Sequence, residues 1–283
     1  MTEKFVTSDG LTLAFHSKGE GPVLVCHPGG PGLSSGYFAG DLGGLDAHFT
    51  LVLLDPRGTG ASQAPEDEQA FTTADYVADV EALRSHLDLE EMNLLGHSHG
   101  GIVAIAYATA HPGRVRRLIV ANSLARINAA EMEQQMEMRS AEPWYANARE
   151  ALAREEAGDY ESDDELREIT SRFWPMYFAQ YDGAAGAYLE AHVQSERSNS
   201  DPLKLFNADI QGGRFDLRPE LERVDVPTLV LAGDSDFICG PACAAELADG
   251  IRGAKRVIVD DCGHFTFVEK PKRWREEITS FVA

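Results

Sequence analysis

The sequence predicts an α/β fold, with a mostly parallel, doubly wound sheet and an inserted helical cap. Short apolar runs bounded by turn residues recur along the chain, and helical patterns separate several of them, which together predict the sheet. The runs stop between residues 124 and 223, where the sequence is charged, prone to form helices and rich in aromatic residues. We therefore expect a core made of residues 1–123 and 224–283 and a helical cap (lid) made of residues 124–223.

The composition supports a globular protein and excludes several classes of partner. Of the 283 residues, 43% are hydrophobic, which is enough to bury a large core. The formal net charge of −21 would repel nucleic-acid backbones and anionic lipid surfaces, so neither nucleic acid nor a membrane is an expected partner. No secretory signal and no apolar run long enough to span a membrane is visible, so we expect a cytoplasmic protein. The oligomeric state stays open.

The strands are predicted from turn signals and apolar runs. Two short strands at residues 4–7 and 11–16 are joined around Asp9-Gly10, a dipeptide that accepts the positive φ of a tight hairpin turn. Continuous apolar runs are typical of strands buried on both faces of a parallel sheet. They occupy residues 22–26, 50–54, 92–95, 117–121, 228–232 and 256–259.

Two crossover helices are predicted between these strands. Thr72 and Asp75 have the spacing of a capping box, and apolar residues recur after them at helical intervals. A second helix is expected from Gly100 to about Ala110, because Pro112 cannot continue it. The crossovers make the sheet doubly wound.

The segment from Gly96 to Gly100 reads Gly-His-Ser-His-Gly and lies between a predicted strand and a predicted helix. That is the context of a nucleophile elbow, in which the flanking glycines let strand and helix approach closely and the serine hydroxyl stands exposed. We predict that Ser98 is a nucleophile. His97 and His99 adjoin it in a turn that points their side chains elsewhere, so we expect them to line a pocket rather than to act as bases.

A serine nucleophile needs a base, and the base needs an acid that orients it. Asp236 follows the strand at 228–232 and His264 follows the strand at 256–259, so both lie at the carboxyl edge of the sheet with Ser98. The chain order Ser, Asp, His fits a catalytic triad of Ser98, Asp236 and His264. Asp234, two residues earlier, is the alternative acid.

Backbone N–H groups are needed to bind the negative oxygen of a tetrahedral intermediate. The N–H of His99, next to the nucleophile, is one candidate. The loop after the strand at 22–26 should supply the second, and its two prolines have no N–H to donate. Gly29 or Gly30 must therefore donate, and we expect Gly30 to form the oxyanion hole with His99.

No cofactor and no metal site is predicted. The four cysteines of this long chain read as reduced thiols rather than a disulfide framework. Zinc is the alternative, with Cys239, Cys243, Cys262 and His264 as ligands, but their spacings fit no common structural zinc site.

With these motifs in hand, the chain resembles the α/β-hydrolases and, among them, the prolyl aminopeptidases (proline iminopeptidases). The resemblance rests on the loop Gly29-Gly30-Pro31-Gly32, the turn Asp55-Pro56-Arg57-Gly58 and the segment from Gly233 to Cys239. The third motif is similar to the pattern around the family's catalytic Asp, which supports Asp236. Pro28, between His27 and the two glycines, departs from the family's pattern.

The resemblance implies a site for a protonated N-terminus, which calls for carboxylates in the cap. Glu190 looks like a cap glutamate of the family, and Glu196 is a second candidate; each has the alternative of lying on a solvated helix face. Gly29 is expected next to the substrate. The cap's aromatic residues would form a small helical core or the apolar wall of a pocket. We expect Trp144, Trp174 and Tyr177 among the substrate-binding residues.

The leading functional hypothesis is a serine hydrolase that removes an N-terminal proline, or another small apolar residue, from short peptides through an acyl-enzyme on Ser98. One alternative is a carboxylesterase, lactonase or amidase acting on small acyl substrates. Another is a ligand-binding receptor that keeps the triad on the same fold, since a fold does not determine a function. The expected partner in the first two cases is a small-molecule or short-peptide substrate.

Overall fold

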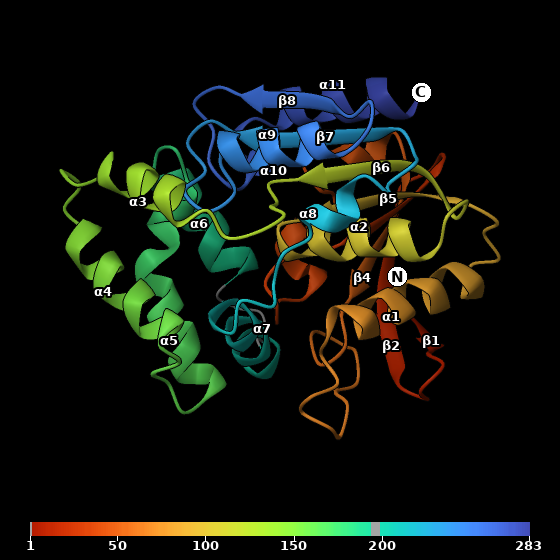
Figure 1. The fold of residues 1–283 in the computed structure, drawn as a ribbon, viewed down its shortest axis with the longest axis horizontal. Helices are drawn as coiled ribbons and strands as arrows, with labels where there is room; N and C mark the ends of the chain where they lie inside the picture. The colour runs from red at the N-terminus through yellow and green to blue at the C-terminus, as the bar shows by residue number, and fades with distance from the viewer. Residues whose placement is uncertain (1, 194–198) are drawn as a thin grey trace.

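The computed structural model describes residues 2–193 and 199–283. The strands in this part of the chain span Thr2–Val6 (β1), Thr12–Lys18 (β2), Val23–His27 (β3), Thr50–Asp55 (β4), Met92–His97 (β5), Val115–Ala121 (β6), Thr228–Gly233 (β7) and Lys255–Val259 (β8). They form one eight-stranded sheet in the order β1-β2-β4-β3-β5-β6-β7-β8 (Figure 1). β2 pairs antiparallel with β1 and β4, and every pair from β4 to β8 is parallel. The predicted fold class is confirmed.

Helices cover both faces of this sheet. The helices around the sheet are η1 (Ser35–Phe38), η2 (Leu45–Ala47), α1 (Thr73–His86), α2 (His99–Ala110), α9 (Pro241–Gly250), α10 (Thr266–Glu269) and α11 (Pro271–Val282). The capping box predicted at the start of α1 is present, with Thr72 and Asp75 bonded in both directions. α2 begins directly after Ser98, as the elbow requires.

Alternating side chains of the strands build two hydrophobic cores. Val25 and Leu94 face one side of the sheet, where α1, α2 and α9 pack. Their neighbours Leu24 and Leu95 face the other side, where η1, α10 and α11 pack. Successive side chains of a strand point to opposite faces, so continuous apolar runs are what a sheet covered on both faces requires.

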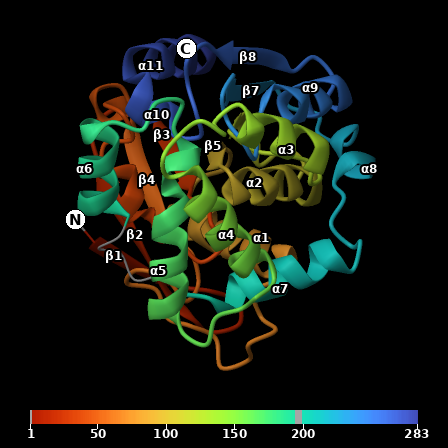
Figure 2. The ribbon, with the colours of Figure 1, turned by 90° about the vertical axis from the view of Figure 1, so that its left-hand side faces the viewer.

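The insertion between β6 and β7 is helical. Its helices in the described part of the chain are α3 (Ala129–Glu137), α4 (Tyr145–Glu156), α5 (Asp163–Phe173), η3 (Trp174–Tyr177), α6 (Gly183–His192), α7 (Asp201–Gln211) and α8 (Arg218–Leu221). In Figure 1, α3, α4 and α5 gather at the end of the sheet toward which the arrowheads of β6 and β8 point, and Figure 2 faces that end. The carboxyl ends of parallel strands are where open α/β sheets bind ligands. The insertion therefore lies beside the edge that carries the candidate site.

A buried polar cluster holds the loops after β3 and β4. The carboxylate of Asp55 accepts hydrogen bonds from the backbone N–H groups of Ser35 and Ala61, both 3.0 Å long. The buried guanidinium of Arg57 donates to both carboxylate oxygens of Asp79, over 2.7 and 2.6 Å. Burial raises the pKa of Asp79 to about 6, against the effect of Arg57. The motif at residues 55–58 thus stabilises the surrounding loops through Asp55 and Arg57.

None of the helices in residues 2–193 and 199–283 has the length and apolar character needed to cross a membrane.

Candidate active site

Ser98 occupies a strained turn between β5 and α2. Its φ of 56° and ψ of −124° lie where a residue other than glycine is strained, which is typical of functional sites. A Cβ on Gly96 would lie 2.1 Å from the carbonyl oxygen of Gly100, and one on Gly100 would lie 2.3 Å from that of His27. Both flanking glycines are therefore sterically required, and the Ser98 side chain is left partly exposed.

Asp236 and His264 form a buried pair. Oδ2 of Asp236 lies 2.8 Å from Nδ1 of His264, and the two residues are 0% and 3% exposed. The other carboxylate oxygen accepts the backbone N–H groups of Ile238 and Cys239, at 3.1 and 3.0 Å. Burial alone would raise the pKa of Asp236, but the His264 ring and these hydrogen bonds hold it below its ordinary value. Asp236 is therefore a carboxylate oriented toward the imidazole.

Asp234, the alternative acid, has a different task. Its carboxylate accepts the backbone N–H groups of Asp261 and Cys262, at 3.1 and 3.2 Å, and so fixes the turn that leads to His264. It makes no hydrogen bond to the His264 ring within the described part of the chain.

Asn122 also belongs to this group, although no sequence motif marks it. Its Nδ2 donates to Oδ2 of Asp236 and to the carbonyl oxygen of Gly263, over 3.0 and 3.2 Å, and its Oδ1 accepts the hydroxyl of Thr266 at 2.9 Å. Its position directly after β6, at the same edge as Ser98, was the available signal. Its φ of 46° is one that Asn tolerates better than most residues.

Ser98, Asp236 and His264 follow β5, β7 and β8, so their loops meet at one edge of the sheet. Among the residues that the structure describes, no hydrogen bond joins the Ser98 hydroxyl to His264. Such bonds are often long without substrate and tighten in the complex.

His97 links the two loops that flank Ser98, rather than lining a pocket. Its Nε2 lies 2.9 Å from the carbonyl oxygen of His264, so it must donate there, which leaves Nδ1 to accept from the hydroxyl of Tyr37 at 2.8 Å. The Tyr37 oxygen in turn accepts the N–H of Gly29 at 2.6 Å. Burial lowers the pKa of His97 to about 3, which keeps the ring neutral. A chain of hydrogen bonds thus runs from the glycine loop to the backbone of His264.

The glycine loop lies against the nucleophile. A Cβ on Gly29 would lie only 2.7 Å from the Cβ of Ser98, so the loop approaches closely because it has no side chain there. The N–H of Gly29 is engaged by Tyr37, whereas the N–H of Gly30 makes no hydrogen bond to any residue that the structure describes. The N–H of His99, at the first position of α2, has no acceptor within its helix. Gly30 and His99 therefore remain the available donors.

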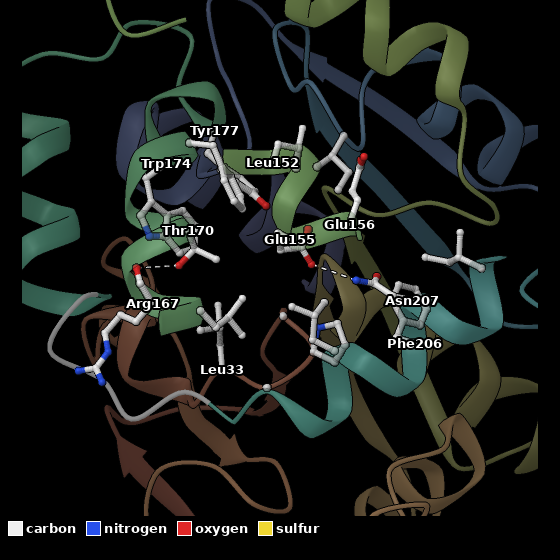
Figure 3. Close-up of a pocket in the computed structure, with 18 of the residues that line it drawn as sticks. Leu33, Leu152, Glu155, Glu156, Arg167, Thr170, Trp174, Tyr177, Phe206 and Asn207 are labelled. Atoms are coloured by element: carbon white, nitrogen blue, oxygen red, sulfur yellow. Dashed lines mark hydrogen bonds between the residues drawn. The ribbon is translucent and has the colours of Figure 1, made fainter. Parts of the chain in front are cut away.

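A cavity of about 370 Å³ lies between the glycine loop and the cap (Figure 3). Gly30 forms part of its wall, and so does Tyr177, whose ring centroid is 5.1 Å from that of His264. Phe206 lines it as well and contacts the ring of His99 at 5.2 Å. Most of the lining is apolar, with side chains such as Leu33, Met132, Leu152, Leu166, Phe173 and Trp174. The cavity therefore adjoins the candidate triad through Tyr177, and it adjoins His99, next to the nucleophile, through Phe206.

The predicted substrate-binding residues are distributed unevenly around this cavity. Trp174 and Tyr177 line it, whereas Trp144 packs against the cap's own hydrophobic core. Gly29 faces Ser98 instead of the cavity wall. Glu190 is exposed on α6 and is not among the lining residues, and Glu196 lies outside the described residues.

Two other carboxylates of the cap, Glu155 and Glu156 at the end of α4, do line the cavity. Glu155 is 8% exposed and accepts a hydrogen bond from Nδ2 of Asn207, 3.0 Å long, which is drawn in Figure 3. Burial raises its pKa from 4.5 to about 7. The signal that could have found it is the stripe formed by Ala148, Ala151 and Leu152, because Glu155 continues that buried face at helical spacing.

One group in the described residues has metal-ligand chemistry. The donor atoms of Asp236, Cys239 and His264 lie within 4.8 Å of one another, whereas Cys243 and Cys262 of the zinc hypothesis are not part of that group. Asp236 and His264 already bond to each other, and burial raises the pKa of the Cys239 thiol well above its ordinary value. The thiolate that a metal would need is therefore disfavoured.

Comparison of the chain with known proteins gives hydrolases in sequence and in structure. The family model for the alpha/beta hydrolase fold matches residues 22–271. The proline iminopeptidase of Lactobacillus helveticus (strain DPC 4571) is 30% identical over 276 residues, which cover 89% of this chain and 87% of that protein. The structure of a hydrolase from Pseudomonas aeruginosa PA01 has a TM-score of 0.75 and 25% identity and covers 100% of this chain and 98% of its own. That of proline iminopeptidase from Mycobacterium smegmatis has a TM-score of 0.72 and 21% identity, with 100% and 97% covered.

Proposed function

The chain belongs to the α/β-hydrolase fold family and is a hydrolase, and from this premise we propose that it cleaves an N-terminal proline, or another small apolar residue, from short peptides. The acyl-enzyme forms on Ser98. The observation that carries the proposal is the buried 2.8 Å contact between Asp236 and His264 at the sheet edge where Ser98 stands in its strained turn. The similarity to proline iminopeptidases supports the choice of substrate.

In this mechanism the proton follows a defined path. The Nδ1–H group of His264 donates a hydrogen bond to Asp236, so the lone pair of the ring lies on Nε2. Nε2 therefore takes the proton of the Ser98 hydroxyl as the Ser98 oxygen attacks the substrate carbonyl. The protonated ring then returns that proton to the leaving amine, and the acyl group stays on Ser98. A water molecule, activated by the same nitrogen, releases the product.

The negative oxygen of each tetrahedral intermediate is bound by the N–H groups of Gly30 and His99. Their availability in the structure supports this assignment. Removing one such donor in a comparable site costs about 3 kcal/mol of transition-state stabilisation.

The division into core and cap is part of the proposal. Residues 1–123 and 224–283 would form the catalytic core, and residues 124–223 the cap that closes the cavity. The cap supplies the cavity wall opposite Gly30, with residues of α3, α4, α5, η3 and α7, which supports a role in holding substrate.

In its ionised form, Glu155 supports an aminopeptidase over an esterase. It is a carboxyl group in a mostly apolar cavity, and among the described residues only Asn207 bonds to it, at one of its two oxygens. A substrate ammonium group bound at the other oxygen would form a charge-assisted hydrogen bond and would stabilise the ionised form of the carboxyl. In this proposal Glu155 takes the part that the sequence analysis gave to Glu190.

A carboxylesterase, lactonase or amidase is the second candidate, and two observations favour it. The cavity is lined chiefly by apolar side chains, and Glu155, with a pKa of about 7, is partly protonated near neutral pH. A protonated carboxyl would act as a neutral hydrogen-bond donor to an ester or lactone oxygen instead of binding a cation.

A matched panel of chromogenic substrates separates these candidates. We would measure kcat/KM of the wild-type enzyme and of Ser98→Ala for a prolyl arylamide with a free amine, the same compound N-acylated, and an aryl ester of similar size. Preference for the free amine, lost in Ser98→Ala, supports the aminopeptidase. Equal hydrolysis of the first two compounds would select the esterase or amidase, and absence of turnover for all three would select a binding protein.

A further inference from the structure

The cap helix α3 binds the loop that carries Asp236. We call residues 234–240 the acid loop. Glu131, Gln135 and Arg139 lie four residues apart, in α3 and just after its end, and therefore share one face. Nε2 of Gln135 donates to the carbonyl oxygen of Asp234 over 3.1 Å, and Nη2 of Arg139 donates to that of Ser235.

Glu131 binds the first turn of the helix that follows the acid loop. Its carboxylate accepts the backbone N–H groups of Ala242 and Cys243, at 2.6 and 3.1 Å, where α9 begins. A carboxylate at a helix N-terminus satisfies unpaired N–H groups and interacts favourably with the helix dipole. α3 therefore binds the start of the acid loop, through Gln135, and the first turn of the helix that follows the loop, through Glu131.

Arg139 is the unusual member of this face. It is 8% exposed, and every hydrogen bond of its guanidinium goes to a backbone carbonyl: Nη1 to Gln135 over 2.8 Å, and Nη2 to both Phe178, over 3.2 Å, and Ser235. Within the described part of the chain, no carboxylate forms an ion pair with it. Burial lowers its pKa, opposed first by the field of Asp236. Burying a cation without an ion-pair partner is costly in free energy, so the bonds of Arg139 to these carbonyl groups indicate a specific role.

The segment around Phe178 holds the backbone of His264. The carbonyl oxygen of Tyr177 accepts the N–H of His264 over 2.7 Å. A Cβ on Gly263 would lie 2.3 Å from that same oxygen, so the two backbones are in direct contact. Nη2 of Arg139 therefore links two carbonyl groups. One belongs to Ser235, directly before Asp236, and the other to Phe178, directly after the residue that binds the His264 backbone.

We propose that Arg139 is a positioning residue, which fixes the separation of Asp236 and His264 by tying Ser235 and Phe178 together. This inference rests on the proposed function, in which that pair activates Ser98. The neighbouring bonds of Glu131 and Gln135 hold the acid loop against α3, and only Arg139 reaches the His264 side as well. Catalytic geometry depends on such support, since a displacement of about 1 Å costs on the order of 100-fold in rate.

The test uses three variants of the full chain. Arg139→Met keeps the length of the side chain and removes every donor. Arg139→Lys keeps the charge and donates to one of the two carbonyls. Arg149→Met is the matched control, because Arg149 is also a cap arginine but bonds to Glu133 on the surface, away from the acid loop. Thermal unfolding is measured for each, along with kcat and KM.

We expect Arg139→Met to lower kcat by at least about tenfold while KM changes by less than about threefold, with Arg139→Lys intermediate and Arg149→Met unchanged. A residue that only anchored the cap would change KM or the melting temperature instead. A folded Arg139→Met with wild-type kcat overturns the proposal. If Arg139→Met does not fold, a wild-type kcat for Arg139→Lys overturns the proposal instead.

A second readout does not depend on activity. The proton between Nδ1 of His264 and Asp236 gives a low-field NMR resonance, which we expect to shift or broaden in Arg139→Met and not in Arg149→Met. An unchanged resonance in the folded variant overturns the inference. If the wild type and Ser98→Ala were equally active, the proposed function would fail, yet this resonance would still report whether Arg139 positions the pair.

Discussion

Oδ2 of Asp236 faces Nδ1 of His264 at 2.8 Å, in surroundings that exclude solvent from both side chains. Because Asp236 is held in its ionised form, the imidazole must donate its Nδ1 proton to it. The tautomer is thereby fixed, with the lone pair on Nε2. The pair is built to accept a proton at one defined atom.

The first prediction concerns the triad as a unit. We expect Ser98→Ala and His264→Ala each to lower kcat by at least about 10³, and the double variant to be scarcely worse, since neither residue works without the other. Steady-state kinetics on the prolyl arylamide, with circular dichroism to check folding, test this. Losses that multiply in the double variant would show that the two residues act independently.

The second prediction concerns the close approach of the glycine loop. Gly29→Ala would place a Cβ 2.7 Å from that of Ser98, so the loop must shift and carry the N–H of Gly30 with it. We expect kcat to fall by at least about tenfold in a folded protein. Gly183→Ala is the control, because a Cβ there meets no atom of the described residues within 4 Å. Equal activity of both variants would remove the glycine loop from the mechanism.

The third prediction assigns the amine site. Glu155→Gln keeps the shape and the bond to Asn207 but removes the charge, so we expect at least a tenfold higher KM for a free-amine prolyl arylamide, the value of one charge-assisted bond of about 1.5 to 3 kcal/mol. KM for a neutral aryl ester should hardly change.

Two variants accompany that measurement. Glu150→Gln, exposed on the same helix, should leave both substrates unaffected. Glu190→Gln tests the sequence hypothesis directly. If it raises KM for the amine and Glu155→Gln does not, the amine binds at α6, and the cavity serves another part of the substrate.

The fourth prediction is a pH dependence of stability. The folded-state pKa of Glu155, about 7, lies above its ordinary 4.5, so the folded protein binds this proton more tightly than the unfolded chain. The free energy of unfolding should therefore fall as pH rises from about 4.5 to about 7. Glu155→Gln has no such loss, and we expect it to be more stable than the wild type by up to about 3 kcal/mol near pH 8 and equally stable near pH 4. Chemical denaturation at both pH values tests this; a difference that is the same at both would contradict it.

The fifth prediction separates Cys239 from catalysis. Its backbone N–H binds Asp236, but its thiol is buried and its pKa is raised, so it is a poor nucleophile. Cys239→Ala should keep kcat within about threefold of the wild type. A chromogenic thiol reagent should react slowly with the native protein and rapidly once it is unfolded. An Ala variant as inactive as Ser98→Ala would give the thiol a chemical role.

The fold and the candidate triad were predictable because their signals are local. Each strand buried on both faces is a continuous apolar run, and the elbow around Ser98 needs small residues at fixed short spacing. The structure extends β5 to His97, two residues beyond the apolar run, because the elbow continues the strand. Asp236 could be preferred over Asp234 from its motif alone.

The proposed amine site at Glu155 and the proposed positioning role of Arg139 were not predictable in this way, because they depend on contacts between distant segments. Glu190 stood out through resemblance, whereas Glu155 becomes visible only when α4 is seen to turn its buried stripe toward the cavity. Arg139 contacts Ser235 across 96 positions of sequence, and no spacing rule connects them.

The hydrogen bonds between the α3 face and the acid loop limit how the cap can be exchanged between relatives. A cap that only covers a cavity could be exchanged as a unit. Recombination between relatives would then change the substrate preference. The first cap helix also binds the loop that carries Asp236, so a graft of the whole insertion would replace the bonds of Glu131, Gln135 and Arg139 along with the cavity wall. Chimaeras should therefore keep residues 131–139 together with Tyr177 and Phe178, whose carbonyl oxygens bind His264 and Arg139.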